Sequence, residues 1–116
     1  MTVQIANITF DCENAAELAG FWAQLLELPV DSEATADFTT VGRSAGASPL
    51  LMFIRVPDKT PGKNVVHLDL TADDLPARID RAIALGAKHI ADFDEYGGQW
   101  TTMADPEGNL FDIAAS

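Results

Sequence analysis

The sequence repeats its pattern of structural elements after 60 residues, and this repeat restricts the possible folds more than any other feature. The alternating segment 7–10 (NITF) aligns with 67–70 (HLDL), and the apolar segment 49–53 aligns with 109–113. Helical patterns follow the first segment of each pair, over residues 14–26 and 74–85. Few residues are identical, so the halves share a pattern rather than a sequence. Such a repeat predicts two similar modules in one chain.

The first half predicts one helix and a series of strands. Residues 3–11 alternate between apolar and polar, as a strand does. Asn14 with Glu17 forms a capping-box pattern, so we expect a helix from Asn14 to residue 26. Two further strands are expected over 38–42 and 50–56, with a short one near Val30.

The second half predicts the same order of elements. Pro and Gly in 58–62 (DKTPG) indicate a linker, after which residues 65–70 alternate as a strand. Thr71 or Asp74 caps a helix that Gly86 ends. Three strands are expected near 88–93, 99–104 and 110–114. The fold class is therefore α+β, with one domain over 1–116 built from two βαβββ modules (1–57 and 63–116) joined by the linker 58–62.

The alternation along each strand assigns side chains to the two faces of the sheet. Val66, Leu68 and Leu70 share an apolar face that a helix can cover, while His67 and Asp69 share the opposite one. We expect a curved mixed sheet around a cleft, with the helices on its outer face. The residues expected to contact a ligand on the cleft face are Asn7, Thr9, Met52, Ile54, Asp69, Trp100 and Thr102.

Charge and cysteine content exclude several classes of function. Seven Lys and Arg against eighteen Asp and Glu give a net charge of −11, which would repel nucleic acid or an anionic membrane. No apolar run approaches the roughly 20 residues that a transmembrane helix needs. The single Cys12 cannot form an intramolecular disulfide, so we expect a cytoplasmic protein.

The repeat, the histidine that opens the second half and the closing segment 100–112 (WTTMADPEGNLFD) resemble the vicinal oxygen chelate superfamily. Within it, the sequence is similar to the glyoxalase-like branch, also called the glyoxalase/bleomycin resistance/dioxygenase family. This resemblance implies the paired-module fold and a homodimer. It implies no single activity, because the superfamily includes isomerases, lyases, dioxygenases and drug-binding proteins.

The resemblance also implies positions for a metal ion. Metal-dependent members place their ligands at the positions occupied here by Asn7, Met52, His67 and Asp112. His67 and Asp112 keep ligand chemistry, whereas Asn7 offers a weak amide oxygen and Met52 a thioether unsuited to such ions. No cofactor is certain on this basis; the resemblance leaves open a divalent ion such as Ni, Zn, Mn or Fe.

Three functions follow from these observations, and the sequence does not decide whether the protein is an enzyme. The leading hypothesis is a protein that binds a small organic molecule. Its chemistry, if any, is that of a glyoxalase-like lyase or isomerase acting beside a carbonyl, with His67 as base and Asp112 orienting it. The first alternative is a metal-dependent lyase or dioxygenase using His67 and Asp112. The second is a non-catalytic drug-binding protein of the bleomycin-resistance type.

Overall fold

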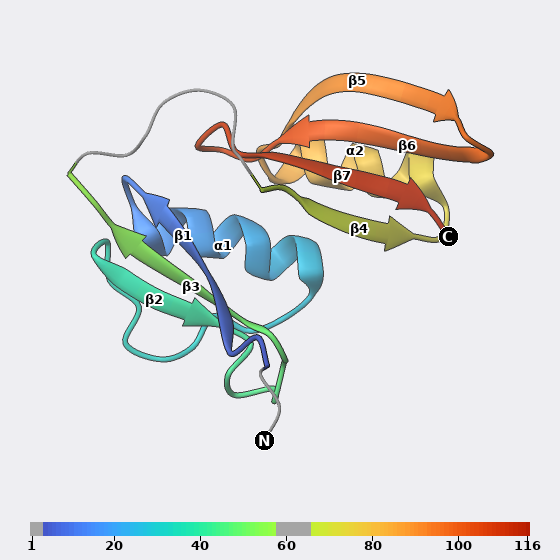
Figure 1. The fold of residues 1–116 in the computed structure, drawn as a ribbon. Helices are drawn as coiled ribbons and strands as arrows, with labels where there is room; N and C mark the ends of the chain where they lie inside the picture. Colours follow the sequence, from blue (N-terminus) through green and yellow to red (C-terminus); the bar gives the residue numbers. More distant parts are fainter. Residues whose placement is uncertain (1–3, 58–65) are drawn as a thin grey trace. The chain divides into compact units, whose positions relative to one another are not determined.

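The computed structural model describes residues 4–57 and 66–116, which form two compact units within 1–60 and 61–116. In each unit one helix lies beside one sheet (Figure 1). The predicted linker 58–62 lies outside the described residues, as do Val3 and Val65 at the ends of two predicted strands. Neither described helix has the length and apolar character needed to cross a lipid bilayer.

The first unit contains a three-stranded mixed sheet. Its elements are β1 (Asn7–Cys12), α1 (Ala15–Leu26), β2 (Phe38–Val41) and β3 (Leu50–Arg55). The strand order is β1-β3-β2, with β1 parallel and β2 antiparallel to β3. The short strand predicted near Val30 is only an isolated bridge between Val30 and Val41.

The second unit contains a four-stranded mixed sheet. Its elements are β4 (Leu68–Ala72), α2 (Leu75–Leu85), β5 (Lys88–Glu95), β6 (Gly98–Ala104) and β7 (Leu110–Ala115). The strand order is β4-β7-β6-β5, and only the pair β4–β7 is parallel. The α+β class and the two βαβββ modules are thus confirmed, with the second strand of the first module reduced to a bridge.

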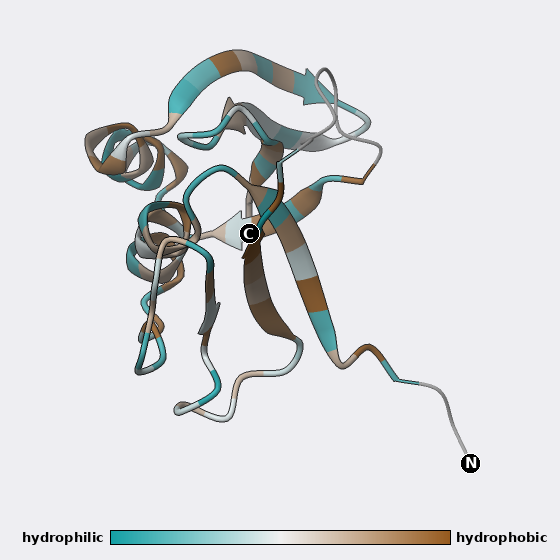
Figure 2. Cartoon of the chain, turned by 90° about the vertical axis from the view of Figure 1, so that its left-hand side faces the viewer, coloured by the Kyte–Doolittle hydropathy of each residue, from teal (hydrophilic) through white to brown (hydrophobic). Residues whose placement is uncertain are grey.

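The repeat is visible in the strand register. Thr9 of β1 lies opposite Met52 of β3, and Asp69 of β4 lies opposite Asp112 of β7, each 60 residues later. Alternation sorts the side chains as predicted: hydrophobic and hydrophilic residues succeed one another along β1 (Figure 2). The two modules therefore share the same parallel pairing, as expected for elements that repeat after 60 residues.

Two strands begin later than predicted. The first strand begins at Asn7 rather than near residue 3, because β3 begins opposite it at Leu50. Similarly, β4 begins at Leu68, so Val66 lies outside the strand and is 75% exposed instead of joining the apolar face. In both cases the alternating pattern extends beyond the partner strand, and only paired residues form a strand.

The strand predicted near 88–93 extends two residues further, through the acidic residues Asp94 and Glu95. Asp92, Asp94 and Glu95 belong to β5, which pairs with β6 through the segment 98–102. Tyr96 and Gly97, with φ of 53° and 77°, form the two-residue connection. Positive φ at both positions is typical of the tight turn that suits twisted antiparallel strands.

The first unit buries its helix deeply. The Asn14 side chain accepts a hydrogen bond from the Glu17 N–H and caps α1, as the capping pattern predicts. Trp22 is buried, and its ring centroid lies 5.4 Å from that of Phe10, which in turn stacks on Phe53. These aromatic contacts join α1 to β1 and β3.

The second unit covers its helix less completely. Asp74, rather than Thr71, caps α2, and Gly86 ends it with φ of 121°. Ala82 is the buried residue of this helix, whereas Ile83 is 45% exposed. The sheet below is better packed, since Met103, Phe111 and Ile113 are buried.

Candidate functional site

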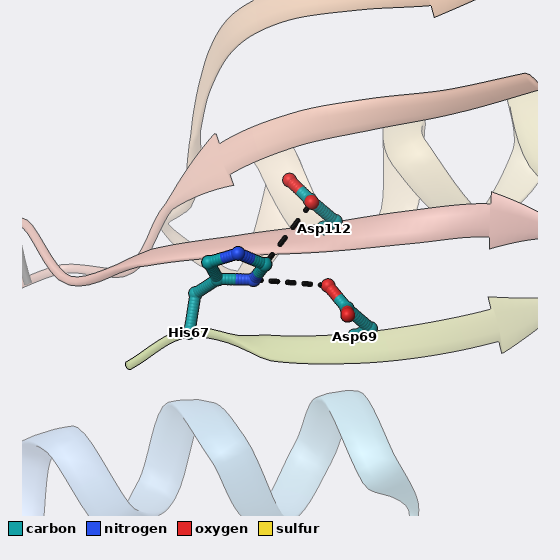
Figure 3. Close-up of side chains that lie close together, drawn as sticks. All are labelled: His67, Asp69 and Asp112. Carbon is teal, nitrogen blue, oxygen red and sulfur yellow. Dashed lines mark ion pairs between the residues drawn. The ribbon is translucent and has the colours of Figure 1, made fainter. Parts of the chain in front are cut away.

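Three ionisable side chains lie together on the sheet of the second unit (Figure 3). His67 immediately precedes β4, Asp69 lies in β4 and Asp112 lies in the neighbouring strand β7. His67 Nδ1 lies 3.0 Å from Asp69 Oδ1 and 3.9 Å from Asp112 Oδ2. The carboxylate nearest to the imidazole is therefore that of Asp69, although Asp112 was expected to orient it.

A threonine on the next strand holds Asp112. Thr102 lies opposite Asp112 in the β6–β7 pairing, and its hydroxyl donates a hydrogen bond of 2.6 Å to Asp112 Oδ1. Phe111 and Ile113, on either side of Asp112 in the strand, are buried. Asp112 and its partners therefore lie on the face of the sheet opposite to these buried side chains.

The three side chains of the cluster differ in how much of each is exposed to solvent. The Asp112 side chain is 21% exposed, that of His67 48% and that of Asp69 69%. A small molecule in solution can therefore reach the imidazole. Asp112, by contrast, is fixed by packing and by Thr102.

Aromatic side chains lie beside this polar cluster. Trp100 lies opposite Ala114, two residues along the strands from the pair Thr102 and Asp112 and so on the same face. Its ring stacks on Phe93 of β5, with centroids 5.2 Å apart. The predicted contact residues Asp69, Trp100 and Thr102 thus share one face of this unit, with an aromatic surface at one end and a polar cluster at the other.

The remaining predicted contact residues belong to the first unit. Asn7 Nδ2 donates a hydrogen bond of 2.9 Å to the Thr9 hydroxyl and also contacts Met52 Sδ at 4.0 Å. Alternation places Ile54 on the same face of β3 as Met52. This face carries no ionisable side chain at the positions that His67, Asp69 and Asp112 occupy in the other module.

The donor set of the cluster fits a divalent metal ion. The nitrogen or oxygen atoms that His67, Asp69 and Asp112 can offer all lie within 4.8 Å of one another. Catalytic zinc sites usually have three protein ligands, and imidazole with carboxylates also suits manganese or iron. The resemblance did not indicate Asp69 as a ligand. The available signal was its position two residues after His67, which places both side chains on one face.

Comparisons with known proteins agree with this architecture. The model of the family described as glyoxalase-like domain matches residues 7–114, so the chain belongs to the glyoxalase-like domain family. No curated protein matches the sequence significantly. The family match confirms the predicted resemblance to the glyoxalase/bleomycin resistance/dioxygenase group.

Several solved structures have a similar fold. A glyoxalase/bleomycin resistance protein/dioxygenase family enzyme from Burkholderia phytofirmans PsJN is 19% identical, with a TM-score of 0.81 over 97% of this chain and 98% of its own. A fosfomycin resistance protein from Listeria monocytogenes is 14% identical, with a TM-score of 0.77 over 100% and 95%. A lactoylglutathione lyase from Agrobacterium tumefaciens is 13% identical, with a TM-score of 0.67 over 99% and 95%. At these identities the similarity establishes the fold alone. The three proteins are named for different functions, so the shared fold does not select one of them.

Proposed function

We propose that the chain binds a small carbonyl compound over the polar face of the second unit and acts on it as a lyase or isomerase. His67 would remove a proton from the carbon beside the carbonyl. The observation that carries this proposal is the 3.0 Å contact between His67 Nδ1 and Asp69 Oδ1.

The contact with Asp69 prepares the imidazole to act as a base. A carboxylate beside Nδ1 favours a proton on that nitrogen, and the partner of one ring nitrogen determines the state of the other. Nε2 then keeps its lone pair and can accept a proton from a bound molecule. The side chain is 48% exposed, which leaves it accessible to such a molecule.

Asp112 supports the same step from the neighbouring strand. With Oδ1 engaged by Thr102, Oδ2 faces His67 at 3.9 Å. This is beyond hydrogen-bond distance but close enough for a charge interaction, so Asp112 would stabilise the imidazolium formed after proton transfer. Trp100 and Phe93 would supply the apolar contact surface for the rest of the molecule.

Deuterium incorporation tests this proposal without knowledge of the product. A panel of 2-oxo acids, hydroxyketones and hemithioacetals is incubated with the protein in D₂O, and NMR follows exchange at the carbon beside the carbonyl. We expect exchange of one class to fall by at least about 100-fold in His67→Ala, the lower end of general-base contributions. Asn7→Ala, at the equivalent position of the first module, is the matched control and should exchange normally. Exchange that survives in His67→Ala would contradict the assignment.

The spacing of the three donors favours a metal-dependent lyase or dioxygenase as a second candidate. His67, Asp69 and Asp112 would hold the ion, and a bound divalent ion would polarise the carbonyl oxygen as a Lewis acid. The test is metal content by mass spectrometry after separate addition of nickel, zinc, manganese and iron(II). Near-stoichiometric metal that is lost in both His67→Ala and Asp69→Asn supports this candidate, and metal retained by either variant argues against it.

The proposal also includes a homodimer and a cytoplasmic location. Half-barrel modules expose strand edges, which a second copy can cover. Sedimentation at several protein concentrations tests the dimer. Tight binding of a small molecule without exchange or metal would instead support a sequestering protein of the drug-resistance type.

A further inference from the structure

A groove in the second unit lies away from the cluster of His67, Asp69 and Asp112. It has a volume of about 480 Å³, within the range of small-molecule sites, and lies between α2 and the β5–β6 hairpin. Leu75, Pro76 and Ile79 of α2 form one wall. The opposite side consists of residues of β5 and β6, among them Asp92 and Thr101.

The charge lining this groove has one sign. Asp80 of α2 and Asp92 and Asp94 of β5 all contribute to it, and none of the described lining residues is Lys or Arg. The histidine of the lining, His89, contacts Asp92 Oδ1 through Nε2 at 2.9 Å. The groove therefore combines an apolar wall with an excess of carboxylates.

Asp92 is fixed in its ionised form. Besides the contact with His89, its Oδ1 accepts a hydrogen bond of 2.7 Å from the Thr101 hydroxyl. The hydrogen bonds from His89 and Thr101 hold the pKa of Asp92 below its usual value, against a smaller opposing effect of desolvation. A negative charge at this position is thus maintained at neutral pH.

The start of α2 does not offer a competing site for anions. Leu75 and Pro76 begin this helix, and the N-terminus of a helix attracts negative charge. Here the Asp74 carboxylate already accepts a hydrogen bond from the Ala77 N–H at 3.4 Å. Negative charge therefore surrounds the groove at this end as well.

We propose that the groove between α2 and the β5–β6 hairpin binds a small organic cation, with an ammonium group beside Asp92 and Asp94 and an apolar body against Leu75 and Ile79. The apolar wall provides contact area, and the carboxylates select the charge. Phe93 and Trp100, which would also contact the carbonyl compound, are among the lining residues of the groove. The cation proposal uses neither of them, nor His67, Asp69 or Asp112, and does not depend on the carbonyl chemistry.

NMR titration of ¹⁵N-labelled full-length protein tests the proposal with three probes of similar size. These are phenethylammonium, neutral 2-phenylethanol and anionic phenylacetate, at pH 7 and constant ionic strength. We expect phenethylammonium to shift the amide signals of Asp92, Gln99 and Thr101 and to bind at least tenfold more tightly than the alcohol. Phenylacetate should leave these signals unchanged.

Matched variants separate a local site from the general attraction of an acidic protein. The pair Asp92→Asn/Asp94→Asn should weaken phenethylammonium binding at least tenfold. Asp94→Asn alone, which leaves Asp92 and its contact with Thr101 in place, should weaken it at least threefold. The pair Glu27→Gln/Glu33→Gln removes two exposed charges from the first unit and should change the affinity less than twofold.

Several results would overturn the proposal. Equal affinity for phenethylammonium and 2-phenylethanol would show that the groove does not select positive charge. Equal weakening of binding by the two double variants would show that the net charge of the protein, rather than the groove, attracts the cation. The groove would instead be assigned to a second copy of the chain if the signal changes depend on protein concentration. In that case Ile79→Lys should abolish both the signal changes and the dimer. Binding to His67→Ala should be unchanged, so failure of the carbonyl proposal is recognised separately.

Discussion

The two modules place very different side chains on the same register. Thr9 lies opposite Met52 in the first module, and Asp69 lies opposite Asp112 at the equivalent positions of the second. A hydroxyl and a thioether offer little acid–base chemistry, whereas two carboxylates beside an imidazole offer much more. The same backbone pairing therefore carries a surface without ionisable side chains in one module and a cluster of three in the other, and the difference lies in a few side chains that the fold does not determine.

The first module, which lacks the ionisable cluster, buries its helix more deeply than the second module does. Helix α1 buries Leu18, Phe21 and Trp22 against its sheet, while α2 buries Ala82 and leaves Ile83 exposed. The incomplete cover of α2 also leaves room for the groove beside β5 and β6. We interpret the first module as the more tightly packed part of the chain, and the proposed binding and chemistry belong to the second.

Removing the largest buried side chain of α1 tests this division most strongly. Trp22→Ala should lower the free energy of unfolding by about 3–5 kcal/mol, the usual cost of emptying a buried aromatic site. Ile83→Ala in α2 should cost less than about 1 kcal/mol, because this side chain is 45% exposed. Urea unfolding followed by circular dichroism measures both. Equal losses of unfolding free energy in the two variants would contradict the conclusion that α1 is packed more tightly than α2.

The chemical difference between the modules is tested at the equivalent positions Thr9 and Asp69. Asp69→Asn should slow the His67-dependent deuterium exchange by tenfold or more, since Asp69 is the carboxylate nearest to the imidazole. Thr9→Ala should leave the exchange rate unchanged. If Asp112→Asn slows exchange more than Asp69→Asn does, the orienting role belongs to Asp112, as predicted from the sequence.

A half-buried carboxylate in the first module, that of Asp31, predicts how stability depends on pH. Burial alone would raise the pKa of Asp31, but hydrogen bonds from the Thr40 hydroxyl and from the Ser44 and Arg43 N–H groups outweigh it and lower the pKa below 3.8. The ionised form therefore stabilises the fold above the unfolded-state pKa, and this contribution is lost as pH falls through the folded-state pKa.

Asp31→Asn should accordingly cost about 1 kcal/mol at pH 7. The difference from the unsubstituted protein should shrink as pH falls below about 4, where Asp31 itself becomes protonated. Unfolding curves at several pH values measure it. Asp92→Asn in the second module should follow the same direction with a smaller effect, because this side chain is exposed. If the difference in free energy of unfolding between Asp31→Asn and the unsubstituted protein stays constant down to pH 2, the ionised Asp31 does not stabilise the fold as described.

The smallest expected effect concerns the candidate site itself. His67→Ala should change the free energy of unfolding by less than about 0.5 kcal/mol, because exposed ion pairs contribute little and surface substitutions are usually tolerated. The same unfolding measurement applies. A loss comparable to that of Trp22→Ala would show that His67 serves the fold rather than a function.

Much of the fold follows from local sequence signals. The repeat predicts the two modules, and alternation predicts which side chains share a face; Asn14 and Gly86 mark helix ends as their chemistry requires. The acidic end of β5 beyond residue 93 could not be predicted in this way, because Asp94 and Glu95 have low strand propensity. Pairing with β6 across the tight turn at Tyr96 decides their conformation.

The candidate site was predictable in composition but not in its contacts. Alternation places His67 and Asp69 on one face, yet it gives no distance that ranks Asp69 before Asp112 as the partner. The stacking of Phe93 on Trp100 depends on the β5–β6 register. The groove beside α2 depends on how a helix packs on its sheet, which no local pattern specifies.

The most direct test of the account is the protonation state of His67. ¹⁵N NMR of the imidazole, with His89→Gln to remove the second histidine, identifies which ring nitrogen of the neutral side chain carries the proton. We predict the proton on Nδ1 in the otherwise unchanged protein and loss of this preference in Asp69→Asn, because the Asp69 carboxylate lies 3.0 Å from Nδ1. A neutral His67 protonated on Nε2 in the presence of Asp69 would contradict the proposed base.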